Sequence, residues 1–158
     1  MTQPRRALAC FFLLLFAAAN AAAFFPDEYK SFGFKEGDVL AYPGNGKFGV
    51  QRILKVDRVL VKRGEAISIR GRKFVAPEDD FLLVVSTSFG APDYDTLEQA
   101  RAAVANKSWK PSTGQMAMSP PGFAKGLVLL RNDPVGEAEL RAYRQWKQAF
   151  DHGQAGIF

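Results

Sequence analysis

The densest group of chemically competent side chains is an acidic run that follows Pro77, made of Glu78, Asp79 and Asp80. Adjacent carboxylates can hold a hard cation, or they can supply the acid and the base of a hydrolase. No second ligand group is recognisable beside them, so a solvated turn before a strand is the other interpretation. A hydrolase that uses the turn from Glu78 to Asp80 is therefore kept as an alternative.

Few residues in this chain are suited to nucleophilic catalysis. The single histidine, His152, precedes Gly153 at the end of a predicted helix, where a cation suits the helix dipole or caps a carbonyl group. The single cysteine, Cys10, falls in the N-terminal apolar segment, and no serine stands in a nucleophile-elbow sequence. These residues predict a protein that is not an enzyme and that binds no cofactor or metal.

Basic residues concentrate around a predicted hairpin that contains Arg70, Arg72 and Lys73. The positive potential of these residues attracts acidic partners over a distance, and the attraction weakens as the salt concentration rises. Once residues 1–23 are removed, the net charge drops from +5 to +3, and no aromatic stacking platform interleaves with the basic positions. Nucleic acid is therefore not an expected partner.

A loop rich in Pro, Gly and Ser extends over residues 110–126 and carries Met116, Met118 and Phe123. Methionine side chains are flexible and adapt to a partner surface, and loops on a rigid scaffold are common recognition elements. We expect these three residues to make the apolar contacts of a partner-binding site, with Arg70, Arg72 and Lys73 adding attraction. Packing of the three apolar side chains against the body of the protein is the competing interpretation.

The N-terminus has the organisation of a secretory signal peptide. Two arginines precede an apolar run at 7–19, and small residues follow at 21–23. The run is shorter than the roughly 20 residues that a transmembrane helix needs. We therefore predict cleavage after Ala23, with Ala21 as the next choice, no transmembrane segment in the product, and a periplasmic or secreted location. Residues 24–158 then form a single domain without a cysteine.

The hydrophobic pattern predicts strands first and helices afterwards, which favours an α+β fold. The slip in alternation at Ile53 and Leu54 indicates a bulge, and the spacing of Thr96 and Gln99 is typical of a capping box. The last helix should turn Tyr143 and Trp146 toward the sheet and end at Gly153. The expected strands lie at 38–42, 48–61, 66–69, 73–76, 81–86, 116–118 and 127–130, and the two helices begin after Thr96 and near Glu137.

Residues 36–53, "EGDVLAYPGNGKFGVQRI", resemble the opening of SH3-like barrels. One similar family is the RNA-polymerase-interacting domain of CarD-type regulators, through "GD", "YP" and the Gly-Val before the second strand. That family usually has a histidine in the turn where this chain has Asn45, and an exported protein would not meet the polymerase. The other is a group of bacterial immunity proteins with SH3-like cores, whose openings share the Gly-Asp, the short strand and the Gly-containing turn.

The resemblance implies a small SH3-like antiparallel β-barrel or curled sheet with two helices, the second of them C-terminal. It also implies an exported binding protein of the immunity type, which inhibits a toxin in the periplasm. Recognition of a cell-wall component such as peptidoglycan is the alternative within the binding class. The partner is then either a protein or a piece of the cell wall.

Overall fold

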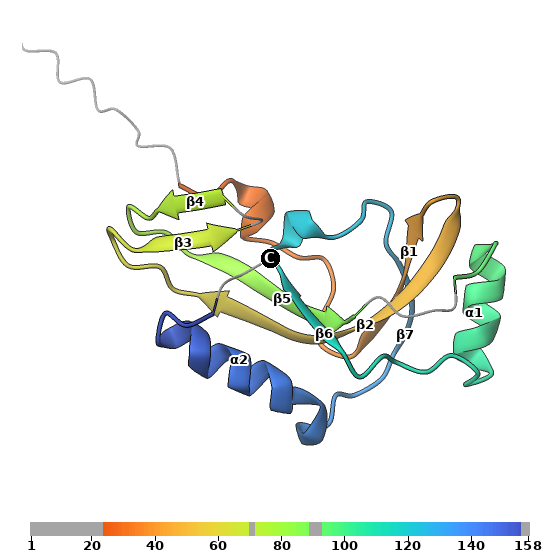
Figure 1. The fold of residues 1–158 in the computed structure, drawn as a ribbon. Helices are drawn as coiled ribbons and strands as arrows, with labels where there is room; N and C mark the ends of the chain where they lie inside the picture. Colours follow the sequence, from red (N-terminus) through yellow and green to blue (C-terminus); the bar gives the residue numbers. More distant parts are fainter. Residues whose placement is uncertain (1–23, 70–71, 89–92, 156–158) are drawn as a thin grey trace, which may run out of the picture.

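The computed structural model describes residues 24–69, 72–88 and 93–155, so the predicted signal peptide at 1–23 lies outside the described residues. Strands and helices follow one another in the order expected for an α+β fold (Figure 1). The elements are η1 (Asp27–Tyr29), β1 (Asp38–Gly44), β2 (Lys47–Val59), β3 (Ala66–Ile69), β4 (Arg72–Val75), β5 (Phe81–Thr87), α1 (Leu97–Ala105), β6 (Gln115–Met118), η2 (Pro120–Gly122), β7 (Val128–Asn132), η3 (Glu137–Leu140) and α2 (Arg141–Asp151), where η marks a 3-10 helix.

The main sheet has five antiparallel strands in the order β6-β5-β2-β1-β7, and β3 pairs with β4 in a separate two-stranded sheet. The α+β class and the two helices, the second C-terminal, are confirmed. The closed-barrel form of the prediction is wrong. β6 and β7 stand at opposite edges of an open sheet, and among the described strands β3 and β4 pair only with each other.

The first hairpin forms because its turn residues accept a left-handed backbone. Asn45 and Gly46 have φ values of 51° and 75°, and they join strands whose last pair is Gly44 with Lys47. A two-residue Asn-Gly connection with two positive φ angles matches the right-handed twist of the flanking strands. The turn predicted from the sequence is thus confirmed.

β2 changes partners along its length. Its residues up to Arg52 pair with β1, and those from Ile53 to Val59 pair with β5. The register shifts between Ile53 and Lys55, which confirms the predicted bulge. The extra residue bends β2 at the point where it passes from one neighbour to the other.

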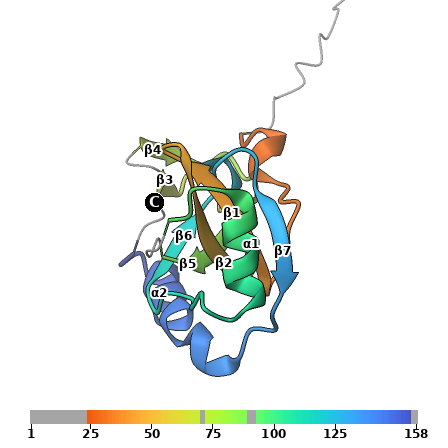
Figure 2. The same cartoon turned by 90° about the vertical axis from the view of Figure 1, so that its right-hand side faces the viewer.

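Three buried clusters hold the elements together. α1 packs Ala100, Ala103 and Val104 against Val39 and Val50, and Figure 2 shows α1 across the end of the sheet beside β1 and β7. A second cluster surrounds Leu40, Ile53 and Val84. The third and largest cluster joins α2 to β2 and β5; its buried residues are Phe25, Leu54, Val59, Val61, Ile67, Ala76, Phe81, Leu83, Val85 and Tyr143.

The start of α1 and the end of α2 both follow their sequence signals. The Thr96 hydroxyl accepts a hydrogen bond from the Gln99 N–H, and the Gln99 side chain accepts from the Thr96 N–H, so the capping box of α1 is confirmed. α2 ends where Gly153, with φ of 70°, donates to the Phe150 carbonyl and Gln154 donates to the Ala149 carbonyl. That pair of bonds is a Schellman motif, and it reverses the chain after the helix.

Candidate functional site

The structure separates the six residues that the sequence singled out for partner binding. Met116 and Met118 lie in β6, whereas Phe123 follows η2 and packs its ring against Phe32 at a centroid distance of 4.9 Å. Lys73 is exposed in β4, which belongs to the other sheet. Arg72 begins β4, and Arg70 lies outside the described residues. The two methionines are thus neighbours, while Phe123 and Lys73 point to different parts of the fold.

Both methionines line a groove of about 610 Å³, which we call the β6 groove. Six consecutive residues from Thr113 to Met118 contribute to it, although side chains in a strand alternate between the two faces. The groove therefore includes the outer edge of β6 as well as the sheet face that α2 covers. Its other walls come from β5, η2 and α2, through Val85, Gly122, Ala142, Tyr143 and Trp146.

β6 is an edge strand, and its outward backbone groups can be identified. The Ser88 N–H donates to the Gly114 carbonyl at 2.7 Å, and the register continues as Ser86 with Met116 and Val84 with Met118. Because bonded pairs alternate in an antiparallel ladder, the backbone groups of Met116 and Met118 face β5. Those of Gln115 and Ala117 point away from β5, toward the groove.

The wall formed by α2 is held in place by a buried tyrosine. Tyr143 is 8% exposed, and its hydroxyl donates a hydrogen bond to the carboxylate of Asp57 on β2. Burial, and then the hydrogen bond to Asp57 and its charge, raise the pKa of Tyr143 well above its usual value. Trp146 stacks on Tyr143 at 6.1 Å and on Phe150 at 5.1 Å, so the half-buried indole stands on a fixed aromatic row.

One end of the β6 groove adjoins a more polar cavity of about 470 Å³. The two share Thr113, Gln115 and Ala142, and the polar cavity adds Glu139 and Arg141. The Gln115 side chain donates to the Glu139 carbonyl at 2.5 Å. The Glu139 carboxylate forms an ion pair with Arg52, which is buried. The polar cavity therefore contains charged side chains, whereas the side chains that line the β6 groove are uncharged.

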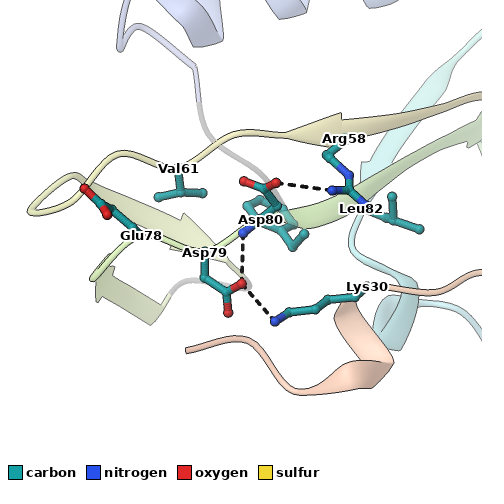
Figure 3. Close-up of a pocket in the computed structure, with 8 residues that line it drawn as sticks. Lys30, Arg58, Val61, Glu78, Asp79, Asp80 and Leu82 are labelled. Atoms are coloured by element: carbon teal, nitrogen blue, oxygen red, sulfur yellow. Dashed lines mark hydrogen bonds and ion pairs between the residues drawn. The ribbon is translucent and has the colours of Figure 1, made fainter. Parts of the chain in front are cut away.

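The acidic turn forms a separate pocket of about 460 Å³, and Figure 3 shows Asp79 beside Lys30 and Asp80 beside Arg58, with Glu78 turned away from both cations. Asp79 pairs with Lys30 at 2.8 Å and accepts the Phe25 N–H at 2.8 Å. Asp80 pairs with Arg58 at 3.4 Å. Lys30 and then the Phe25 N–H hold the pKa of Asp79 below its usual range. Within the described part of the chain, no group of three or more histidine, cysteine or acidic side chains is arranged to hold a metal ion.

The remaining titratable candidate is His152, which is the C-cap residue of α2. Its ring Nδ1 lies 2.6 Å from the Gln148 carbonyl oxygen. This geometry agrees with the carbonyl-capping role expected from its place beside Gly153.

In the part of the chain that the structure describes, no helix is both long enough and apolar enough to cross a membrane.

Sequence reasoning missed two features of this region. The contribution of Ala142, Tyr143 and Trp146 to the groove was hidden, because the helical pattern predicts only that the aromatic residues face the sheet. The edge position of β6 depends on strand order, which four residues of sequence do not encode.

Comparisons with protein-family models, with curated proteins and with solved structures found no match to this chain.

Proposed function

We propose that this chain is an exported, non-enzymatic binding protein that takes an extended segment of a protein partner into the β6 groove. The single observation that carries the proposal is the outer edge of β6, which pairs with no other described strand and lies in an apolar groove. The Gln115 and Ala117 backbone groups point into that groove, and no charged side chain lines it. An added strand would satisfy these backbone groups, and its side chains would meet Met118 and Trp146.

The side chains that line the β6 groove and the adjoining polar cavity define the peptide segment that would fit. Beside Met118 and Trp146 the occupant needs apolar or β-branched side chains, because a charge there would lose water without gaining a partner. Toward Gln115 the polar cavity offers Arg141 and Glu139, so a polar or charged residue suits that end. The partner is thus an extended peptide with one apolar end and one polar end.

Inhibition of a toxin is the specific form of binding that we propose first. It is supported by the resemblance of residues 36–53 to immunity proteins and by the secretory pattern of residues 1–23. Export predicts that the protein isolated from its native envelope begins at or near Phe24, which N-terminal sequencing measures. A cytosolic protein that retains Met1 would contradict the location and remove the periplasmic toxin as a partner.

The binding mode can be tested by removing one outward-pointing N–H group. In Ala117→Pro, the lost N–H faces the groove and not β5, so the ladder between β5 and β6 keeps its bonds. The matched control is Ala124→Pro, at an exposed loop position outside the groove, preceded by Phe123 with φ of −77° and ψ of 152°. That backbone suits the residue before a proline.

The probes are eight-residue peptides selected from a random display library against the wild-type protein. We expect alternating apolar residues in the selected peptides, and a loss of affinity of about tenfold or more in Ala117→Pro but not in Ala124→Pro. Bound peptide should protect the Gln115 and Ala117 amides from hydrogen exchange, because these amides donate to no acceptor among the described residues of the free protein. Equal binding by Ala117→Pro would overturn strand addition.

Binding to the cell wall gives a different result in the same set of variants. Sedimentation with insoluble peptidoglycan that is lost in Trp146→Ala but kept in Ala117→Pro would indicate stacking of a sugar on the indole. That outcome would replace the protein partner by a glycan.

A further inference from the structure

The first two described residues are built into the largest core cluster. The Phe25 ring is 2% exposed and lies 4.8 Å from the Phe81 ring, centroid to centroid. Phe24 is half-buried and contacts Phe25 at 4.6 Å and Phe74 at 5.8 Å. These residues directly follow the predicted cleavage point after Ala23, so the segment that would begin the processed protein is part of the fold.

Asp79 holds this segment by its backbone. Its carboxylate accepts the Phe25 N–H at 2.8 Å, and its side chain is 16% exposed. Adjacent backbone nitrogens are no more than about 4 Å apart, because only two atoms separate them. Cleavage after Ala23 would therefore leave the new α-ammonium group of Phe24 close to the Asp79 carboxylate.

The pocket at Asp79 contains charges of both signs. Glu78, Asp79 and Asp80 line it together with Lys30 and Arg58, and Figure 3 shows Glu78 turned away from both cations. Each cation already has a carboxylate partner, Lys30 with Asp79 and Arg58 with Asp80. An α-ammonium group at Phe24 would add a second cation beside the Asp79 carboxylate, which already accepts the neighbouring Phe25 N–H.

We propose that the acidic turn is the receptor for the mature N-terminus, so that cleavage after Ala23 creates an ion pair between the Phe24 α-ammonium group and Asp79 and locks the processed fold. The inference rests on the export part of the proposed function, and it does not involve the β6 groove. It assigns a role to the one acidic cluster of the sequence that needs neither a metal ion nor catalysis.

The test uses the product that a bacterial host exports from the full chain, with its start at Phe24 checked by N-terminal sequencing. Its α-amino group is acetylated selectively at pH 6.5, where lysine side chains are far more fully protonated. Thermal unfolding is then measured for wild type, Asp79→Asn and the control Asp80→Asn, each with a free and an acetylated N-terminus. Peptide binding in the β6 groove is measured on the same samples.

We expect acetylation to lower the unfolding midpoint by about 2–4 °C in wild type and in Asp80→Asn, and to have little effect in Asp79→Asn. An opposite charge raises the pKa of an amine, so this stabilisation is fully present below the unfolded value of about 7.7–8.0 and is lost as the pH rises above it.

Three results would overturn the inference: an equal effect of acetylation in Asp79→Asn, no effect in wild type, or an exported product that starts at another residue. Because Asp79→Asn leaves the β6 groove intact, peptide binding should be unchanged in that variant. A failure of the N-terminal lock is therefore distinguishable from a failure of the proposed function, which would appear as absent peptide binding with normal effects of acetylation.

Discussion

The hydroxyl group of Tyr143 on α2 donates a hydrogen bond to the carboxylate of Asp57 on β2, across the interface between the last helix and the main sheet. Asp57 is paired with Leu83 of β5, so the bond joins α2 to the strand pair that supports β6. Tyr143 also lines the β6 groove. The position of the groove wall therefore depends in part on this hydrogen bond between α2 and the main sheet.

Tyr143→Phe should lower the free energy of unfolding by about 1–3 kcal/mol, because Asp57 Oδ2 loses its donor while the aromatic packing is kept. Urea denaturation at pH 7 measures the loss. Tyr29→Phe is the matched control, since the Tyr29 hydroxyl has no hydrogen-bond partner among the described residues. Equal stability of the two variants would show that the bond to Asp57 contributes nothing.

Alkaline pH should weaken the same interface. The pKa of Tyr143 is raised by burial, by its hydrogen bond and by the charge of Asp57, so the folded protein keeps a proton that the unfolded chain releases near pH 10. Its stabilisation is fully present below about pH 10 and is lost as the pH rises further. Urea midpoints measured from pH 8 to 11 should fall more steeply in wild type than in Tyr143→Phe. Parallel curves would contradict the assignment to Tyr143.

Local sequence signals were enough to predict most elements of the fold. The Asn45-Gly46 turn, the bulge after Ile53 and the capping box at Thr96 each depend on residues that are close in the chain. The open sheet could not be predicted in the same way. Whether β6 and β7 meet depends on strand order and curvature, which arise from packing over the whole domain.

The site was predictable only in part, for a similar reason. Met116 and Met118 were recognised because methionine side chains in a loop can adapt to a partner surface, and they line the β6 groove. Phe123 shares the same loop but reaches Phe32, which is 91 positions earlier in the chain. The contact between Phe25 and Asp79 is also long-range, and neither residue carries a local signal for it.

Gly49→Ala should destabilise the first hairpin. Gly49 pairs with Tyr42 across the strands, and a Cβ atom at position 49 would stand 2.1 Å from the Tyr42 ring. The ring must then leave its place over the glycine, at a cost of about 1–3 kcal/mol. Chemical denaturation measures the cost, and repeating the change in a Tyr42→Ala background should make it smaller. An equal cost in both backgrounds would mean that the tyrosine ring is not the obstacle.

Thr96→Ala should cost about 0.5–2 kcal/mol, because the Gln99 N–H loses its acceptor at the start of α1. Thermal unfolding with circular dichroism measures this effect. Glu98→Ala, in the first turn but outside the capping box, is the control and should cost less. If both variants unfold at the wild-type midpoint, α1 does not depend on its cap.

Trp146→Ala should separate the contributions of α2 to stability and to binding. The indole is only half-buried, so we expect a loss of about 1–3 kcal/mol, which is less than the 3–5 kcal/mol of a fully buried tryptophan. Because Trp146 lines the β6 groove, its removal should also weaken binding of the selected peptides by about tenfold. Urea denaturation and fluorescence anisotropy of labelled peptides measure the two effects.

Phe150→Ala is the matched control for Trp146→Ala, because Phe150 stacks on Trp146 and packs against the same core cluster but does not line the groove. It should lose stability by a similar amount and keep its affinity for the peptides. Wild-type affinity in Trp146→Ala would mean that the indole only supports the core. A loss of affinity in both variants would instead indicate that binding depends on the placement of α2 as a whole and not on contact with the indole.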